Sequence, residues 1–188
     1  RDVPGKPLLD QMEVFFLRSA DDGKTWDIIL QVPEGMDKTA HPSGGLNETA
    51  LIENDQGEII ALSRSQKEAH KMYLSISKDE GLTWSNPVDS GMYGLPPQMI
   101  KLNDGRILCT YGRRYAPTGI FARISNDGGH IWLDEEEIVI NDRFPGNPND
   151  NGYPISVQLD DGSIFTIYYK AGADGVISYI GGTHWRID

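Results

Sequence analysis

Two charged side chains stand where apolar segments of the sequence begin or end. Glu48 lies at the entrance of the apolar run 50–52, where a carboxylate is out of character. Arg64 ends a segment that begins with the apolar run 59–62. A guanidinium binds both oxygens of a carboxylate through its planar fork and stays charged, so Arg64 is suited to holding an anionic ligand.

An arginine pair and a tyrosine occupy similar places further along the chain. Arg113 and Arg114 follow the apolar segment 107–111, and Tyr153 stands directly before Pro154 at the start of another apolar run. A residue before proline is held extended, which would aim the Tyr153 hydroxyl inward. Plainer explanations stay open for all these places: charges solvated at strand ends, an arginine pair that offsets surplus acid, and a tyrosine that only packs.

The elements that must position these residues are indicated by a repeated octapeptide with the pattern S-x-D-x-G-x-[T/I]-W. Its copies are Ser19–Trp26, Ser77–Trp84 and Ser125–Trp132, and a weaker fourth copy, Ser178–Trp185, has Ile180 where the others have Asp. Asp and Ser side chains can accept bonds from nearby backbone N–H groups and so close a turn. The Trp can pack beneath that turn and give its indole N–H to a carbonyl.

A second turn signal runs in phase with the octapeptides. Asp-Gly-type turns at 55–57, 104–105 and 161–162 each lie between two apolar stretches, which is a strong hairpin signal because Gly accepts a positive φ. The flanking segments Glu58–Leu62, Arg106–Tyr111 and Ser163–Tyr169 are therefore expected to be strands. No stretch keeps a 3.6-residue apolar period, so little helix is expected.

The octapeptides resemble Asp-boxes, the turn motif of sialidases and other bacterial-neuraminidase-repeat (BNR) proteins, and the resemblance runs from about Val14 to Trp185. It implies an all-β fold, a sialidase-like β-propeller built from four-stranded antiparallel blades, with each Asp-box joining the third and fourth strands of a blade. Such blades cannot bury both faces alone and must stack on neighbours. The alternative is a small β-domain that uses the same turns.

The resemblance also implies an incomplete ring in this chain. We expect one partial propeller domain over residues 1–188, with the end of one blade at 1–45 and blades at 46–91, 92–141 and 142–188. That is about three and a half blades, whereas sialidase-like propellers have six. Open sheet edges would need cover, so we expect either the C-terminal part of a larger propeller or self-association of two copies.

The same resemblance gives roles to the chemistry-bearing residues. It makes Tyr153 the nucleophile, Glu48 its base, and Arg64 with Arg114 a clamp for the substrate carboxylate, although the spacing leaves Arg113 open as the clamp residue instead. The implied reaction is hydrolysis of a sialic-acid-type glycoside, where a neutral tyrosine avoids the repulsion that an anionic nucleophile would meet. No segment matches the family's acid/base Asp or its first clamp Arg, so weak or no turnover is expected from this chain.

Two other functions remain open because Asp-boxes mark a fold and not a chemistry. One is a noncatalytic propeller that binds a carbohydrate or a protein. The other is an enzyme acting on a different acidic glycan, such as a uronate-containing one, that keeps the arginines and changes the rest. Asn47-Glu48-Thr49 is also a glycosylation sequon, a motif that often occurs by chance.

The composition of the chain excludes some classes of binding partner. The 188 residues carry a formal net charge of −11, which argues against binding to nucleic acid or to an anionic membrane. No apolar run reaches the roughly 20 residues of a membrane span. The chain shows no initiator Met and no signal peptide, so we expect a removed leader or a piece of a longer protein, with an extracellular or periplasmic location.

No cofactor or metal is implied. The single cysteine, Cys109, excludes an internal disulfide and is expected to be a buried small apolar residue. The four histidines have no metal-ligand spacing. Oxygen-rich side chains at 141–142 and 149–151 could hold calcium, but a polar connecting loop is the preferred interpretation, and Glu135–Glu137 are expected to form a solvated strand rim.

Overall fold

The structure is a computed structural model that describes residues 14–30, 45–65, 70–133, 137–143, 150–172 and 178–187. In these ranges all regular secondary structure is β, arranged as four antiparallel sheets, which confirms the predicted all-β fold. None of the described residues forms a helix able to cross a membrane. Cys109 is buried, as predicted.

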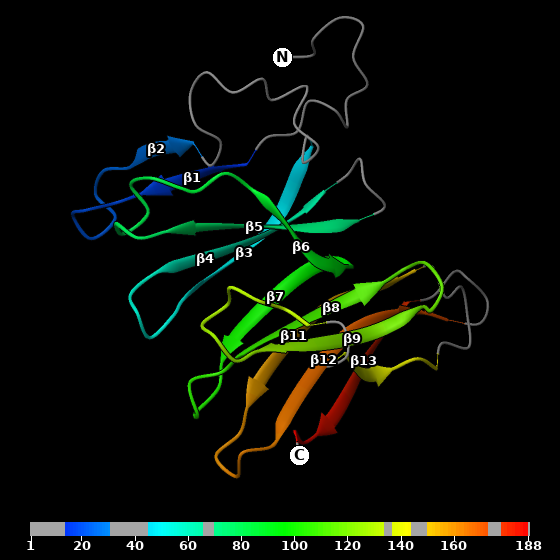
Figure 1. Ribbon diagram of the computed structural model, residues 1–188. Helices are drawn as coiled ribbons and strands as arrows, with labels where there is room; N and C mark the ends of the chain where they lie inside the picture. Colours follow the sequence, from blue (N-terminus) through cyan, green and yellow to red (C-terminus); the bar gives the residue numbers. More distant parts are fainter. Residues whose placement is uncertain are drawn as a thin grey trace, which may run out of the picture.

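The sheets follow one another along the chain (Figure 1). The first is a pair, β1 (Phe15–Arg18) and β2 (Asp27–Leu30). The second contains β3 (Leu46–Glu53), β4 (Ile59–Ser65), β5 (Lys71–Ser77) and β6 (Val88–Tyr93). The third contains β7 (Leu95–Lys101), β8 (Ile107–Arg113), β9 (Gly119–Ser125) and β10 (Ile138–Asn141), and the fourth β11 (Asn151–Gln158), β12 (Ile164–Ala171) and β13 (Ser178–Trp185).

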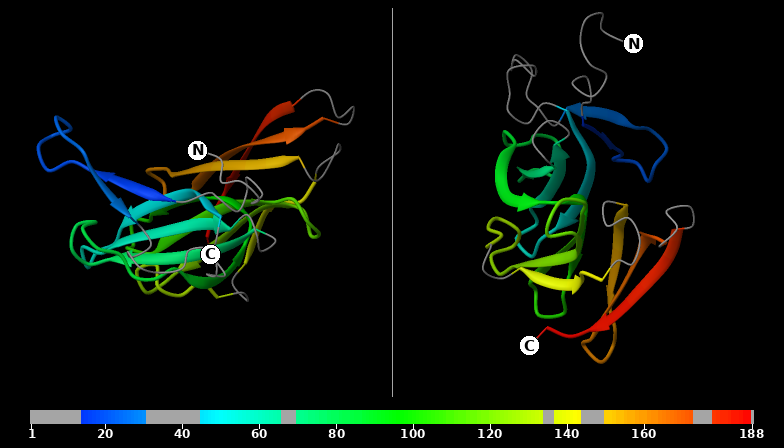
Figure 2. Two further views of the ribbon diagram at one scale, coloured as in Figure 1. Left: turned by 90° about the horizontal axis from the view of Figure 1, so that it is seen from above. Right: turned by 90° about the vertical axis from the view of Figure 1, so that its right-hand side faces the viewer.

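One edge strand of each of the last three sheets faces a common axis. These strands are β3, β7 and β11, and β7 contacts both of the others. We call them the inner strands; Figure 2 shows the sheets fanning out from them. Apolar side chains fill the space between successive sheets, with Leu62, Met99 and Tyr111 between the second and third, and Leu108 and Ile164 between the third and fourth.

The octapeptides close as turns through their aspartates. Asp79 Oδ1 accepts the backbone N–H of Thr83 at 2.8 Å, Ser77 Oγ accepts that of Gly81 at 2.8 Å, and the Trp84 indole donates to the Gly81 carbonyl at 3.2 Å. The copies that end at Trp26 and Trp132 make the corresponding bonds. In every case the turn joins the last two strands of its sheet.

The octapeptide turns and the Asp-Gly turns lie at the same end of the sheets. Strand β4 follows the Asp-Gly-type turn at 55–57 and runs to Arg64. Strand β5 then runs back from His70 to the octapeptide turn that begins at Ser77. The opposite end therefore carries the ends of β4, β8 and β12 and the beginnings of the inner strands. All the candidate chemistry-bearing residues lie at that end.

The fourth octapeptide was wrongly expected to be a turn. Residues Ser178–Trp185 form β13 and pair with β12 along their whole length. Ile180 takes the place of the aspartate, so no carboxylate is present to collect backbone N–H groups and close the turn. The Trp185 indole donates to Thr166 Oγ1 at 3.0 Å, not to a glycine carbonyl.

The two end sheets expose apolar side chains, whereas the third sheet packs against the second on one side and the fourth on the other. Phe15 and Leu17 are more than half exposed on the first sheet, as are Ile155, Val157 and Ile180 on the last. Ile155 and Val157 lie two positions apart on one strand, so their side chains share a face of the last sheet.

The octapeptide tryptophans provide an internal test of what these turns contribute. Trp84 is 8% exposed and packs against Phe16 at 4.3 Å between ring centroids, whereas Trp26 is 58% exposed. We expect Trp84→Ala to lower the free energy of unfolding by about 3–5 kcal/mol, and Trp26→Ala by about 1 kcal/mol or less. Urea unfolding followed by circular dichroism measures both; equal losses would show that the indole bond, not burial, carries the stability.

Candidate functional site

The inner strands β3 and β11 carry the same irregularity near their first residues. Pairing of β3 with β4 shifts register between Asn47 and Ala50, and pairing of β11 with β12 shifts between Gly152 and Ile155. Glu48 and Tyr153 lie inside these bulges at φ 45° and 48°. A left-handed backbone costs free energy for a residue other than glycine, so it persists only where the surrounding structure holds it, often at functional sites. A bulge also changes the direction in which a side chain points.

The two strained residues meet across the axis. The Tyr153 hydroxyl donates to Glu48 Oε1 at 2.7 Å, although 105 positions separate them in the chain. The other carboxylate oxygen, Oε2, forms an ion pair with Arg64, 3.1 Å from Nε, while the Nε–H group donates its hydrogen bond to Asn47 Oδ1 at 2.9 Å. Arg64 is 8% exposed, so it is a buried partner of Glu48 and not a solvated strand end.

Arg114 joins the same cluster from the third sheet. Its Nε donates to the Asn151 carbonyl at 3.0 Å, and its Nη2 donates to the Tyr169 hydroxyl at 2.7 Å. That hydroxyl in turn donates to Asp150 Oδ1 at 2.7 Å. Burial, together with the bond to Asp150, raises the pKa of Tyr169 to about 12, so the hydroxyl stays protonated.

A glycine allows this junction between the third and fourth sheets. A Cβ on Gly112 would lie 2.7 Å from Gly152 Cα and 2.9 Å from the Leu95 carbonyl oxygen, so no larger residue fits without a backbone shift. Because β8 approaches β11 this closely, Arg114, two residues beyond Gly112, reaches the backbone of Asn151.

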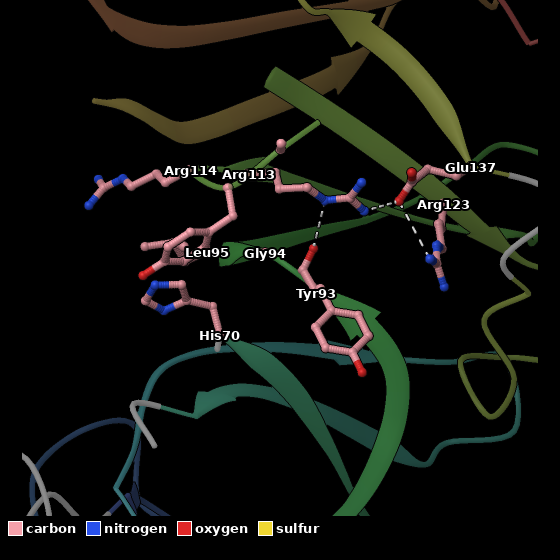
Figure 3. A pocket seen from close by; sticks show the side chains of 10 residues that line it. His70, Tyr93, Gly94, Leu95, Arg113, Arg114, Arg123 and Glu137 are labelled. Carbon is pink, nitrogen blue, oxygen red and sulfur yellow. Dashed lines mark hydrogen bonds and ion pairs between the residues drawn. The ribbon is translucent and has the colours of Figure 1, made fainter. Parts of the chain in front are cut away.

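Arg113 points the opposite way, which separates the two arginines that the sequence left open (Figure 3). Its guanidinium pairs with Glu137 and lies over the Phe121 ring, 4.4 Å from the centroid. Its Nε donates to the Tyr93 carbonyl. The geometry therefore brings Arg114, and not Arg113, to Tyr153 and its partners.

The expectation that Glu135–Glu137 form a solvated rim is wrong for Glu137, which has several protein partners. Its Oε1 accepts the Tyr111 hydroxyl at 2.7 Å and lies 3.4 Å from Arg123 Nη2, in addition to the Arg113 pair. Burial by itself would raise the pKa of Glu137, but these bonds outweigh it and hold the pKa below its usual range. Residues 135 and 136 lie outside the described residues.

A cavity of about 470 Å³ opens beside the cluster, between the second and third sheets. Its lining includes His70, Tyr93, Arg114, Tyr115 and Glu137. Arg114 is thus shared between the cavity and the cluster around Tyr153. No sequence signal marks His70 or Tyr169, and only the strand pairing in the structure places Tyr169 opposite Gly152.

The calcium alternative falls partly outside the described residues, because Asn149 is not among them. Asp150, one of the two carboxylates among those candidates, accepts the Tyr169 hydroxyl. Within the described ranges no three His, Cys, Asp or Glu side chains gather as a metal site.

Comparisons with solved structures show which fold this is. The structure of a protein of unknown function from Dyadobacter fermentans is 30% identical, with a TM-score of 0.74 over 92% of this chain and 45% of that one. The Hadza microbial sialidase Hz136 is 16% identical, with a TM-score of 0.66 over 97% and 41%. The intramolecular trans-sialidase from Ruminococcus gnavus is 17% identical, with a TM-score of 0.55 over 93% and 38%.

The sialidase similarities establish a sialidase-like propeller fold, and the chain spans less than half the length of each of these structures. No curated protein matches the chain. The model of the BNR repeat-like domain family matches residues 3–166. Because that match extends over most of the sequence, the chain belongs to the BNR repeat-like domain family.

Proposed function

We propose that this site belongs to a glycoside hydrolase that acts on an acidic, sialic-acid-type sugar. The observation that carries the proposal is the hydrogen bond from Tyr153 to Glu48, with Arg64 on the other carboxylate oxygen. A phenol held by a carboxylate, beside the buried guanidinium of Arg64 and the partly buried one of Arg114, supplies a nucleophile, its base and an anion-binding group in one place.

In the proposed reaction the substrate carboxylate binds to Arg64 and Arg114. Tyr153 Oη attacks the anomeric carbon while its proton passes to Glu48, and the bond from that carbon to the leaving oxygen breaks. Water then attacks the anomeric carbon as the bond to Tyr153 breaks: one proton of the water restores the acid that protonated the leaving oxygen, and the proton held by Glu48 returns to the phenol. A neutral nucleophile suits this substrate because its carboxylate adjoins the reacting carbon.

The leaving oxygen needs a proton from a further acid. Within the described part of this cluster the carboxylates are Glu48, which takes the phenol proton, and Asp150, which accepts the Tyr169 hydroxyl. We therefore propose that the acid, like the cover for the exposed faces of the end sheets, comes from further blades or from a second copy of the chain. An extracellular or periplasmic location fits a glycan substrate.

The first test concerns the phenol. The bond to Glu48, with burial and the carboxylate charge adding to it, raises the pKa of Tyr153 above its ordinary 10.0, so the phenol stays protonated at neutral pH. We expect Glu48→Gln to lower the Tyr153 pKa toward 10.0, because the charged acceptor is removed. Carbon-13 NMR of ζ-labelled tyrosine measures it, with Tyr153→Phe for assignment. The control Glu80→Gln, on an exposed octapeptide turn, should leave the Tyr153 pKa unchanged. An unchanged Tyr153 pKa in Glu48→Gln would show that the bond to Glu48 is absent.

The second test concerns the anion clamp. A crystal soaked with 2-deoxy-2,3-didehydro-N-acetylneuraminic acid should show its carboxylate on Arg64 and Arg114. Arg64→Lys keeps the charge beside Glu48 but loses the fork, so we expect affinity to fall by about tenfold or more. Calorimetry measures the change, and the matched Arg106→Lys, on the Asp104 turn at the opposite end, should leave affinity intact. A carboxylate bound elsewhere would refute the clamp.

The third test concerns turnover. Acting alone, the 188-residue chain should release sialic acid from 3′-sialyllactose weakly or not at all, because its sugar leaving group needs a proton and the lack of that assistance costs a factor of about 10²–10⁴ in rate. Robust hydrolysis that Tyr153→Phe abolishes would place the acid within this chain. Binding without turnover in the intact protein would favour a carbohydrate-binding propeller instead.

A further inference from the structure

Arg114 lies just beyond the paired part of its strand. The last pair between β8 and β9 joins Arg113 to Gly119, so Arg114 follows the last residue of β8 that this pairing holds. Its side chain is partly buried and extends away from Glu137 (Figure 3). A long side chain in such a place loses rotamer freedom when it binds a ligand, at a cost in affinity, unless contacts within the protein already hold it.

Two contacts with the fourth sheet hold the Arg114 guanidinium. Nε donates to the Asn151 carbonyl at 3.0 Å, and Nη2 donates to the Tyr169 hydroxyl at 2.7 Å. Because a guanidinium is planar and rigid, two fixed nitrogens set the directions of all its N–H groups. Among the described residues, Nη1 and the second hydrogen of Nη2 have no acceptor. These N–H groups are therefore the ones that a ligand carboxylate can use.

The groups that hold Arg114 are uncharged, unlike the group that holds Arg64. Arg64 lies 3.1 Å from a carboxylate oxygen of Glu48, whose charge offsets its own. Arg114 is held by a backbone carbonyl and by a phenol, and burial together with the bond to Asp150 raises the pKa of that phenol to about 12, so it stays neutral. Within the described part of the chain, Arg114 is thus fixed in place without a carboxylate in contact with it.

Asp150 orients the phenol for this task. A hydroxyl has one hydrogen and two acceptor lone pairs. Tyr169 gives its hydrogen to Asp150 Oδ1 at 2.7 Å, which leaves the lone pairs for Arg114. The Asp150 carbonyl in turn accepts the Ala171 N–H at 2.9 Å, which ties it to the end of β12. Residues 150 and 151 and the end of β12 therefore form one support for the guanidinium.

We infer that Tyr169, oriented by Asp150, is the positioning residue for Arg114, and that it holds the guanidinium ready for a ligand carboxylate without neutralising it. Tyr169 contributes in this way through Arg114 and not by touching the carboxylate itself. The inference rests on the proposed function, because it takes the carboxylate of the ligand to bind to Arg114.

The test is a double-mutant cycle on the intact protein, with 2-deoxy-2,3-didehydro-N-acetylneuraminic acid as the ligand and calorimetry as the measurement. Tyr169→Phe removes only the hydroxyl and should weaken binding about fivefold, the worth of one hydrogen bond. In a protein that already carries Arg114→Ala, Tyr169→Phe should have no further effect, because the guanidinium that it positions is gone. In a protein that carries Arg64→Lys, the fivefold loss should persist.

The neighbouring tyrosine on β12 provides a matched control. The Tyr168 hydroxyl bonds to Asn141 and Thr183, and its side chain points to the opposite face of the strand. Tyr168→Phe should therefore leave the affinity unchanged. Should Tyr169→Phe fail to fold, Asp150→Ala, which keeps the phenol and removes its acceptor, should weaken the ligand where Arg114 is present and not in Arg114→Ala.

The outcomes separate this inference from the proposed function. An equal loss from Tyr169→Phe with and without Arg114, or no loss in either case, overturns the positioning role of Tyr169. Binding that still depends on Arg64 and Arg114 then leaves the proposed function standing. Failure of the unaltered protein to bind the ligand overturns the proposed function and this inference with it.

Discussion

The arrangement at the site depends on one hydrogen bond, from Tyr153 to Glu48, that spans the ends of two inner strands from different sheets. Both residues sit in bulges with left-handed backbone, a conformation that costs of order 1–3 kcal/mol each. The bond and the Arg64 pair offset that cost only if the sheets keep their relative positions. The close approach at Gly112 and the cores between the sheets therefore preserve the site as well as the fold.

Charge is distributed unevenly in this molecule. The chain as a whole is strongly acidic, yet Arg64, Arg114, Arg113 and Arg123 gather around the ends of the inner strands. Two of them share Glu137, and one pairs with Glu48. The repulsion of anions by the acidic chain is thus offset locally, at the ends of the inner strands, by these guanidiniums.

Features set by short stretches of sequence could be predicted, and those set by distant parts could not. The octapeptide turns and Asp-Gly hairpins follow from side chains within a few residues, so the all-β fold and most strand positions were foreseen. The octapeptide pattern does not form a turn at Ser178–Trp185, because Ile180 stands in place of the aspartate that closes the other turns, although the Trp is kept. The choice between Arg113 and Arg114, the burial of Glu137 and the place of His70 depend on where strands end and which sheet they meet, and no local pattern encodes that.

The opposite directions of Arg113 and Arg114 have a consequence for how this protein can vary. Successive side chains along a strand point to opposite faces. The consecutive positions of Arg113 and Arg114 therefore direct one guanidinium to Glu137 and the other to Tyr169. A one-residue slip of β8 would exchange them, but it would also turn core side chains such as Ile107, Cys109 and Leu108 to the opposite faces of the sheet. The packing between the sheets therefore also fixes which arginine faces Tyr169, and a change of length in the hairpin at 102–106 should be taken up by the loop and leave both arginines in place.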